Sequence, residues 1–289
     1  MTDKFRVTGG KGFSLKDFDP DYSDDMQKED TDEILLDLIK QVAALQSKLY
    51  ADKRYALLVL FQGMDAAGKD GAIAHTMSGL NPQWCNVHSF KQPSAEELSH
   101  DFLWRHYKAL PEFGHMGVYN RSHYENVLIT KVHPELLLKE TLPGITKVKD
   151  INKKFWKHRY ESIVDFEKHL SRNGMIILKF FLHLSKDEQK KRFLERIDDP
   201  AKNWKFSAAD IEERAYFNEY MKAYEKAIKE TATNENPWYV IPANKKWFTR
   251  IAISTIILEQ LESLKLEYPV LPPDEMKKLD GAKKLLLEG

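Results

Sequence analysis

Residues 55–75 read YALLVLFQGMDAAGKDGAIAH, and this stretch decides the fold. Its first part, Tyr55 to Phe61, is an apolar run rich in Val, Leu and aromatic residues, which is typical of a strand buried on both faces. Its middle, Gly63 to Lys69, has two glycines five positions apart and a lysine directly after the second, the Walker A spacing of a phosphate-binding loop. A helix from about Gly68 to Met77 should follow. The order of strand, glycine-rich loop and helix predicts an α/β fold built around an anion site.

The chemistry expected of this loop comes from its backbone and from one side chain. Glycines let the loop turn consecutive N–H groups inward, through backbone angles that a side chain would forbid. Lys69 adds a point charge, and the helix that follows sets its positive end against the same anion. The alternative is that a glycine-rich strand-to-helix turn is only a turn. The residues predicted to contact phosphate here are Gly63, Met64, Ala66, Ala67, Gly68, Lys69, Asp70 and Gly71.

Two carboxylates set this loop apart from the usual pattern. Asp70 stands where Ser or Thr normally follows the lysine and offers a hydroxyl to Mg²⁺, and Asp65 lies inside the loop. A carboxylate in a phosphate cradle repels its ligand unless a divalent cation lies between them. Asp65 is therefore predicted to face a metal ion, with Mg²⁺ expected and Mn²⁺ as the alternative.

Composition limits the class of protein. The chain has 289 residues, enough for one large α/β domain or two small ones, and its 44 Lys and Arg balance 44 Asp and Glu. This balance gives no sign of a nucleic-acid partner, although a basic groove could be balanced by an acidic exterior. The single cysteine, Cys85, rules out an internal disulfide. Because we find neither a secretory leader nor a long apolar span, we expect a cytoplasmic protein without membrane contact.

Apolar spacing elsewhere predicts strands that alternate with helices. Strands are expected at 86–90, 116–120, 175–184 and 238–241, and helices at 31–49, 94–110, 151–170 and 247–261. This alternation favours a parallel, doubly wound sheet of about five strands. We divide the chain into an irregular N-terminal arm at 1–30, interpreted as a solvated tail, a main α/β domain at 31–265 and a charged C-terminal tail at 266–289.

Polar residues follow the second predicted strand, at the edge where a doubly wound sheet binds its ligands. Lys91 comes directly after this strand and is a candidate anion contact. The next helix begins at Ser94, with Glu97 completing a capping box, and it carries Asp101 on a polar face. For Asp101, an acceptor-binding role and a plain solvated helix face are the two alternatives.

The third predicted strand ends in Asn120 and Arg121, with Glu125 four residues beyond. A basic residue and a carboxylate at this edge are well placed to bind phosphate and metal. The alternative is a helix start capped by Ser122, in which Glu125 completes the capping box, and both interpretations can hold together. Arg121 has no capping role, so it carries more of the functional hypothesis than Glu125.

Residues 186–230 are predicted to form a helical lid. Arg192 and Arg196 lie one turn apart on one helix face, and Lys205 and Arg214 follow. Arginines that close over phosphates both stabilise charge and exclude water. The alternative is a plain helical hairpin with exposed ion pairs, because the segment holds as many acids as bases.

A phosphate loop, a doubly wound sheet and a lid together make up the design of a phosphoryl-transfer kinase. That reaction requires the protein to hold phosphates in line and to neutralise charge with metal, lysine and arginine. Asp65 and Glu125 would then either hold Mg²⁺ or position the acceptor oxygen. The residues alone leave both roles open.

Four stretches, in this order, closely resemble the polyphosphate kinase 2 family: FQGMDAAGKDG at 61–71, SFKQPSAEELSHDFLWR at 89–105, GVYNRSHYENVL at 117–128 and KRFLERIDDPAKNWKFSAADIEER at 191–214. The likeness covers about residues 10 to 265. It implies a P-loop kinase fold with a helical lid, dependence on Mg²⁺, and phosphoryl transfer between polyphosphate and a nucleotide. The nucleotide would be an adenine nucleotide, with guanine as the alternative, and the protein would be a homo-oligomer, either a dimer or a tetramer.

The same resemblance implies roles for individual residues. It adds to the candidate metal ligands, Asp65 and Glu125, a place in the central catalytic set. The implied catalytic residues are Asp65, Lys69, Arg121, Glu125 and Arg192, and the implied lid contacts to phosphate are Arg192, Arg196, Lys205 and Arg214.

Position 120 suggests the branch of the family. Members that mainly phosphorylate nucleoside diphosphates often carry Asp there, in an FDRSWYNR-like context, whereas this chain reads YNRSHYEN, similar to the branch that accepts mono- and diphosphates. The resemblance therefore favours conversion of AMP to ADP and then to ATP, with polyphosphate as donor. The alternatives are a diphosphate-only polyphosphate kinase, an ATP-dependent kinase for a nucleoside monophosphate or other small molecule, and a non-catalytic nucleotide-gated switch.

Overall fold

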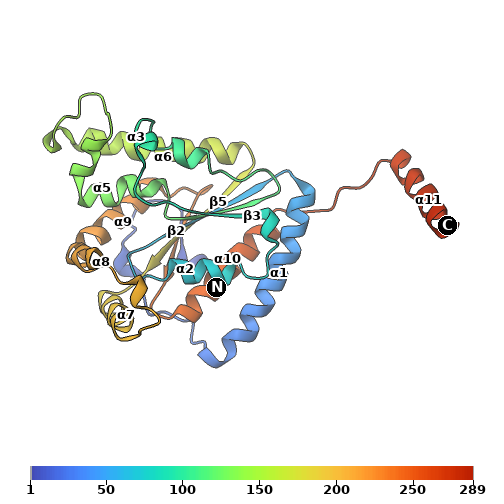
Figure 1. The fold of residues 1–289 in the computed structure, drawn as a ribbon, viewed down its shortest axis with the longest axis horizontal. Helices are drawn as coiled ribbons and strands as arrows, with labels where there is room; N and C mark the ends of the chain where they lie inside the picture. The colour runs from blue at the N-terminus through green and yellow to red at the C-terminus, as the bar shows by residue number, and fades with distance from the viewer. Residues whose placement is uncertain (1, 289) are drawn as a thin grey trace.

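The computed structural model describes residues 2–288, apart from the side chains of Asp30 and Lys205. Within this range six strands form one sheet in the order β1-β6-β5-β2-β4-β3 (Figure 1). The strands are β1 (Arg6–Val7), β2 (Ala56–Gln62), β3 (Cys85–Ser89), β4 (Met116–Asn120), β5 (Met175–His183) and β6 (Trp238–Pro242). Strands β2 to β6 pair in parallel, whereas β1 pairs antiparallel to β6. The expected α/β fold with a parallel sheet is confirmed.

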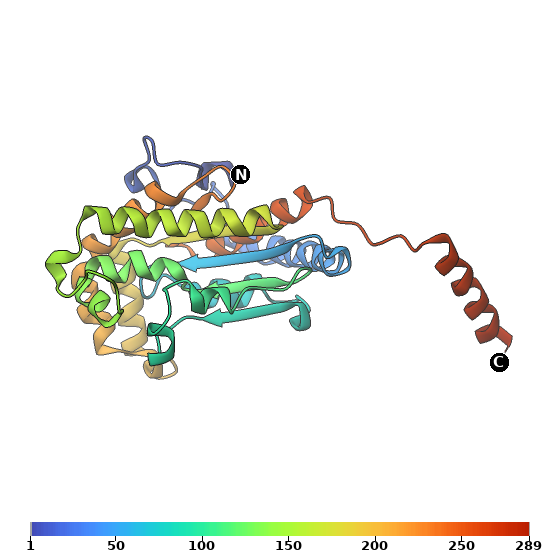
Figure 2. The ribbon, with the colours of Figure 1, turned by 90° about the horizontal axis from the view of Figure 1, so that it is seen from above.

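Helices cover both faces of the sheet (Figures 1 and 2). On one face lie α1 (Thr31–Asp52), α2 (Lys69–Thr76) and α10 (Lys246–Ser263), and on the other lie α5 (Ile129–Val132), α6 (Lys153–Arg172) and α9 (Phe217–Thr231). Each face has its own apolar core, because the buried side chains of a strand alternate between the two layers. The sheet is therefore covered on both sides, as parallel sheets are.

Strand β2 is the centre of this arrangement. All seven of its residues are buried, and it pairs with β4 on one side and β5 on the other. Its apolar run therefore packs into both cores, as the sequence predicts. Phe61 of β2 lies opposite Asn120 of β4, so the glycine-rich loop after β2 and the polar segment after β4 emerge side by side.

The N-terminal arm differs from the solvated tail that we expected. It contributes β1 and three 3₁₀ turns, at Thr2–Phe5, Leu15–Asp17 and Lys28–Asp30. Its apolar side chains are buried against the rest of the chain: Phe5, Val7, Phe13 and Leu15. This packing could not be predicted from the sequence, because these residues follow no single period. Phe5 enters one core, and the other three enter the second.

The prediction of one continuous helix at 94–110 is also wrong. The segment forms two short helices, α3 (Ala95–Leu98) and α4 (Trp104–Tyr107). The predicted capping box at Ser94 and Glu97 does begin α3. Between the helices, the Asp101 carboxylate accepts a hydrogen bond from the Leu103 backbone N–H over 2.9 Å. Such a local bond competes with the helical pattern and allows the chain to leave it.

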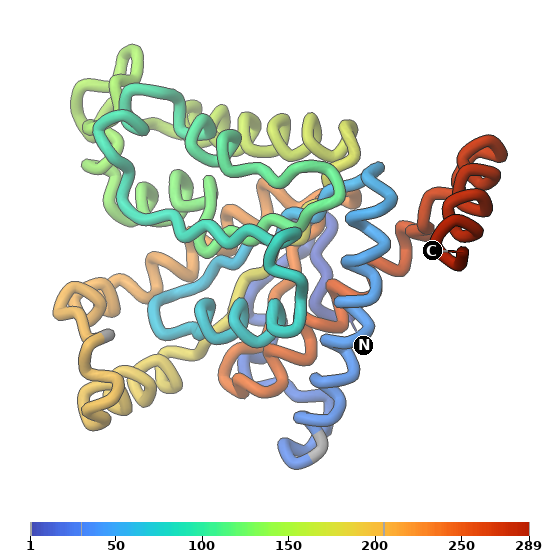
Figure 3. Tube along the Cα trace, turned by 45° about the vertical axis from the view of Figure 1, so that its right-hand side comes forward, coloured from blue at the N-terminus to red at the C-terminus, as the bar shows by residue number. Residues whose placement is uncertain are grey.

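Two segments project from the body of the molecule. Helices α7 (Lys186–Asp198) and α8 (Ala208–Glu213) form a hairpin beside the sheet (Figure 3). The predicted lid at 186–230 is too long, because α9 packs into the core on a face of the sheet. The C-terminal helix α11 (Pro273–Glu288) stands apart at the end of an extended linker, and all its residues are exposed (Figures 1 and 2). None of the helices described in residues 2–288 is both long enough and apolar enough to span a lipid bilayer.

Candidate active site

The loop between β2 and α2 has the backbone that its glycines predict. Gly68 has a φ of 97°, in the left-handed region that disfavours side chains. Gly63 packs so closely that a Cβ atom would lie 3.1 Å from the Leu182 carbonyl oxygen. The loop therefore passes from the end of β2 into α2 in a path that needs glycine at both positions, and the N-terminal end of α2 faces the space above the loop.

Lys69 is held by the backbone of its own loop. Its Nζ donates to the Gly63 carbonyl oxygen over 2.6 Å and to that of Met64 over 3.2 Å. The side chain is buried, and this burial, followed by the charge of Arg121, lowers the pKa of Lys69 to about 8. The ammonium group is therefore fixed in position beside the loop and is easier to deprotonate than an exposed lysine.

Helix α7 fastens the other side of the loop. The buried Arg192 donates from Nη1 to the carbonyl oxygens of Ala66 and Ala67, over 2.9 and 3.1 Å. Its Nη2 donates to the carbonyl oxygens of Ala243 and Asn244 after β6, over 2.6 and 3.0 Å. Every nitrogen of this guanidinium is used, because Nε donates to Glu188 over 2.9 Å. Arg192 thus joins the phosphate loop to the end of β6.

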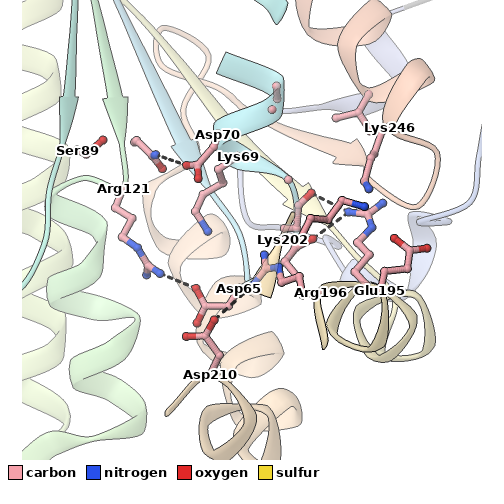
Figure 4. A pocket seen from close by; sticks show the side chains of 18 of the residues that line it. Asp65, Lys69, Asp70, Ser89, Arg121, Glu195, Arg196, Lys202, Asp210 and Lys246 are labelled. Carbon is pink, nitrogen blue, oxygen red and sulfur yellow. Dashed lines mark hydrogen bonds and ion pairs between the residues drawn. The ribbon is translucent and has the colours of Figure 1, made fainter. Parts of the chain in front are cut away.

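Arg121 connects Asp65 and Glu125, and Figure 4 shows its contact with Asp65. Its Nη2 donates to Asp65 Oδ1 over 2.6 Å, and its Nη1 lies 3.4 Å from Glu125 Oε2. The negative charge of Glu125 raises the pKa of Arg121, burial lowers it, and the charge of Asp65 raises it again. The pKa of Arg121 therefore lies above its ordinary value. Arg121 itself has a φ of 65°, which turns its side chain from the end of β4 toward the loop. The polar segments after β2 and β4 therefore meet in one charged cluster.

The two other polar residues of these segments also pair. Asn120 Nδ2 donates to Asp70 Oδ1 over 2.7 Å, so the amide at the end of β4 is directed at the start of α2 (Figure 4). Ser122 caps the 3₁₀ helix η5 (His123–Val127) by accepting from the Tyr124 N–H. Glu125 does not complete the predicted capping box there, because its carboxylate lies against Arg121. The functional alternative for Glu125 is thus the one that its geometry favours.

A cavity of about 700 Å³ opens above the loop. The predicted residues that line it are Asp65, Ala66, Ala67, Gly68, Lys69, Asp70, Gly71, Lys91, Asn120, Arg121, Arg192 and Arg196. Five charged residues that we did not predict also line it: Glu195, Lys202, Asp210, Lys246 and Arg250. Figure 4 shows Lys202, Arg196 and Lys246 on the side of the cavity away from Arg121. Basic side chains therefore extend from the loop along the lid and onto α10.

A second cavity, of about 510 Å³, adjoins the first. The two share Asp65, Phe90, Lys91 and Arg121 as lining residues. Glu125 lines the second cavity only, and much of its remaining wall is apolar or aromatic: Leu98, Phe102, Ile129, Leu136 and Tyr220. The Arg121–Asp65 pair thus stands where a charged cavity and a more apolar one meet.

Some predicted residues lie elsewhere. Gly63 and Met64 belong to the loop but line neither cavity. Asp101 is exposed and lines neither, and Arg214 donates to the Lys186 carbonyl oxygen over 3.1 Å, within the hairpin. The side chain of Lys205 lies outside the described residues. The structure therefore brings together the loop, the segment after β4 and the first turns of the lid, but not Asp101 or Arg214.

Two residues that support the site were not predicted. Gln189 donates to the Asp65 carbonyl oxygen over 3.0 Å, and Tyr224 of α9 lies beside the Gly63 backbone. Both are buried and come from segments more than a hundred residues away along the chain. Gln189 offered one signal, because it lies one turn before Arg192 on the same helix face.

The carboxylates fit a Mg²⁺ site that is completed by the substrate. Among the described residues, no cluster of three or more His, Cys, Asp or Glu side chains has the arrangement of a metal site. Mg²⁺ is usually bound by one or two carboxylates together with substrate phosphates. Asp65 and Glu125 are both partly exposed toward the cavities and could supply that share.

Comparison with known proteins identifies the family. The model of the family "Polyphosphate kinase 2 (PPK2)" matches residues 25–269. The chain is 51% identical to the ADP-polyphosphate phosphotransferase of Rhodopseudomonas palustris, over 99% of each chain. It is 43% identical to the AMP/ADP-polyphosphate phosphotransferase of Meiothermus ruber, over 92% of this chain and 95% of the relative.

A solved structure agrees with these matches. The crystal structure of polyphosphate kinase 2 from Arthrobacter aurescens TC1 superimposes with a TM-score of 0.88 at 40% identity, covering 99% of this chain and 95% of the other. The family assignment agrees with the matched sequence stretches, with the parallel sheet and with the loop after its central strand. We conclude that this chain belongs to the polyphosphate kinase 2 family and is an enzyme of the phosphotransferase type.

Proposed function

We propose that the protein transfers a phosphoryl group from inorganic polyphosphate to AMP and to ADP, giving ADP and ATP, with Mg²⁺ as cofactor. The relatives named above are polyphosphate phosphotransferases for ADP and for AMP/ADP, and family membership brings the same donor into consideration here. The further support comes from the charges and shapes of the two adjoining cavities.

The observation that carries the proposal is the charge of the first cavity. Eight basic and four acidic side chains line it, although the whole chain has a formal net charge of zero. Its basic residues run from Lys69 past Arg196 and Lys202 to Lys246 and Arg250. A row of positive charge that extends well beyond one phosphate loop suits a linear chain of phosphates. A short donor such as ATP would need only the basic groups nearest to the loop.

The second cavity suits the acceptor nucleotide. Its apolar and aromatic walls can hold a base and ribose, while its shared wall with the first cavity carries Asp65 and Arg121. An acceptor bound there would direct its terminal phosphate at the end of the polyphosphate on the loop. The two substrates would then meet at the Arg121–Asp65 pair.

Each residue of the cluster has a role in this arrangement. The loop N–H groups and Lys69 would bind the terminal phosphates of the donor, and Arg121 would stabilise the charge of the group in transfer. Asp65 and Glu125 orient Arg121 and would hold Mg²⁺, which neutralises phosphate charge when bound. Arg192 keeps the loop in shape through the carbonyl oxygens of Ala66 and Ala67. Positioning and charge stabilisation are the main requirements of this reaction.

The decisive experiment incubates the protein with AMP, Mg²⁺ and polyphosphate in the absence of ATP, and follows ADP and ATP by chromatography. We expect ADP first and ATP later. No product from either AMP or ADP would exclude the proposal. Product with ATP as donor but none with polyphosphate would instead support the ATP-dependent kinase, and tight nucleotide binding without turnover would support the switch.

A second candidate is an enzyme that accepts ADP only. It is favoured by the name of the 51% identical relative, which mentions ADP alone. ATP from ADP, with no ADP from AMP, would establish this narrower activity. Parallel reactions with GMP and GDP test the base, and light scattering tests the homo-oligomer, dimer or tetramer, that the family resemblance favours.

A further inference from the structure

An ion pair is buried in the core beside the active site, and neither cavity includes it. Lys179 stands in the middle of β5 and is fully buried, and Glu167 of α6 is 1% exposed. The Lys179 Nζ lies 2.6 Å from Glu167 Oε2. Burial raises the pKa of Glu167, but the contacts with Lys179 and His123 lower it by more. The net shift is downward, and the carboxylate stays charged. A charged pair at such depth needs a reason, because apolar residues usually fill a core at no loss of stability.

The pair is the centre of a larger hydrogen-bond network. The Tyr124 hydroxyl donates to Glu167 Oε1 over 2.7 Å, and the His123 Nε2 lies 3.3 Å from the same oxygen. Lys179 donates to the Tyr124 hydroxyl over 3.2 Å and to the Thr231 carbonyl oxygen over 3.0 Å. The network therefore joins α6, β5 and the end of α9 to two consecutive residues, His123 and Tyr124, which are themselves fully buried.

His123 and Tyr124 lie inside the segment after β4 that carries Arg121 and Glu125. Arg121 is two positions before His123, and Glu125 directly follows Tyr124. Arg121 has a positive φ, a conformation that persists only where the surroundings fix it. On its core side η5 meets the buried charges of Lys179 and Glu167 through His123 and Tyr124. The network thus anchors the short stretch that presents Arg121 and Glu125 to the two cavities.

We propose that Lys179, Glu167 and Tyr124 are positioning residues that fix the orientation of Arg121 and Glu125, and that this network sets the rate of phosphoryl transfer. The inference rests on the proposed function for its kinetic part. It does not involve contact with substrate. Removing one hydroxyl from the network should loosen η5, misplace the Arg121 guanidinium and leave the binding of polyphosphate along the first cavity unchanged.

The first test compares two single-atom changes in the same core. Tyr124→Phe removes the networked hydroxyl, and Tyr160→Phe removes a buried hydroxyl from α6 that has no hydrogen-bond partner among the described residues. We expect Tyr124→Phe to lower kcat by about 10-fold or more, because a small misplacement of reacting groups strongly reduces the rate. Its KM for polyphosphate should stay within about 2-fold of the wild-type value. Tyr160→Phe should match the wild type. Equal kcat in all three proteins would overturn the inference.

The second test asks whether the hydroxyl acts through Arg121. In an Arg121→Lys background, the guanidinium fork that the network orients is already gone. Tyr124→Phe should then change kcat by less than about 2-fold, because groups that act as one unit are not additive. If Tyr124→Phe lowers kcat by the same factor in both backgrounds, the hydroxyl acts independently of Arg121 and the inference is wrong.

A variant that replaces the whole network covers the case in which Tyr124→Phe folds poorly. Lys179→Met, Glu167→Leu and Tyr124→Phe together fill the space with apolar groups, and such replacements are often neutral or stabilising. We expect a Tm at or above that of the wild type and a kcat as low as that of Tyr124→Phe. Wild-type kcat in this stable protein would show that the network is structural only.

An independent measurement separates this inference from the proposed function. Hydrogen exchange of the backbone amides at 121–127 should accelerate in Tyr124→Phe and stay unchanged in Tyr160→Phe. If the wild type makes no nucleotide from polyphosphate but the exchange rates behave in this way, the proposed function fails and the anchoring stands. Unchanged exchange in Tyr124→Phe would refute the anchoring whatever the activity.

Discussion

Lys69 donates a hydrogen bond to the carbonyl oxygen of Gly63, 2.6 Å away, and so ties the last residue of the phosphate loop to its first. The contact places the ammonium group inside the turn that the loop N–H groups surround. Because the backbone fixes this position, the charge is already in place for the proposed phosphate ligand. Preorganised charge of this kind is the main means by which such a site accelerates phosphoryl transfer.

Replacing Lys69 by alanine should therefore lower turnover far more than it lowers stability. One preorganised charge is worth roughly 3 kcal/mol of transition-state stabilisation, or a factor of about 10² to 10³ in kcat. The fold should remain intact, because the change removes a buried charge rather than an apolar anchor. Turnover from AMP and polyphosphate together with a thermal melt measures both effects. Lys284→Ala, on the exposed helix α11, is the control, and near-normal turnover of Lys69→Ala would mean that the site is misplaced.

Activity should depend on pH through the same lysine. Burial, followed by the charge of Arg121, lowers the pKa of Lys69 to about 8, so the free enzyme holds the charged form below this pH and loses it above. We expect kcat/KM for polyphosphate to fall as pH rises through about 8, since kcat/KM reports the ionisation of the free enzyme. In Lys69→Arg, which stays charged, the alkaline fall should vanish even if the activity is low. The same fall in Lys69→Arg would assign it to another group.

Arg192 should matter for the shape of the loop. Lysine at this position cannot replace a guanidinium that donates to four carbonyl oxygens at once. Each buried acceptor left without a partner costs about 1–3 kcal/mol, so we expect Arg192→Lys to lower Tm and to raise KM for polyphosphate together. The neighbouring Lys191→Met, at an exposed side chain, serves as the control. A variant with unchanged Tm but lost turnover would instead make Arg192 a direct phosphate contact.

Two adjacent glycines test the packing of the N-terminal arm. A Cβ atom on Gly10 would lie 2.2 Å from the Lys229 carbonyl oxygen, whereas one on Gly9 would meet nothing within 4 Å. Gly10→Ala must therefore displace the arm from α9, and we expect a clear fall in Tm, because overpacking typically costs about 1–3 kcal/mol. Gly9→Ala should leave Tm nearly unchanged. Equal melting of both variants would show that the arm does not pack in this way.

The sequence predicts those parts of the molecule that depend on neighbours along the chain. The apolar run of β2, the glycines of its loop and the capping box at Ser94 are local patterns, and each is present. The convergence of Asp65 and Arg121 was also within reach, because the ends of parallel strands meet at one edge of a sheet.

The parts that the sequence does not predict depend on distant partners. Arg192 was expected to close over phosphate from a lid, yet its guanidinium binds carbonyl oxygens, and no local pattern reveals such partners. The arm lacks any period because its apolar residues enter two different cores. One signal was available: Lys179 interrupts the apolar run MIILKFFLH, and a charge inside a central strand points to a buried partner.

The pairing of β1 with β6 has a consequence for how the protein is made. Arg6 and Val7 lie opposite Tyr239 and Trp238, so the first described strand of the sheet to be synthesised pairs with the last one. During translation β1 has no strand to pair with until β6 has emerged, more than 230 residues later. Synthesis must therefore pass Pro242, the end of β6, before the nascent chain can complete this sheet.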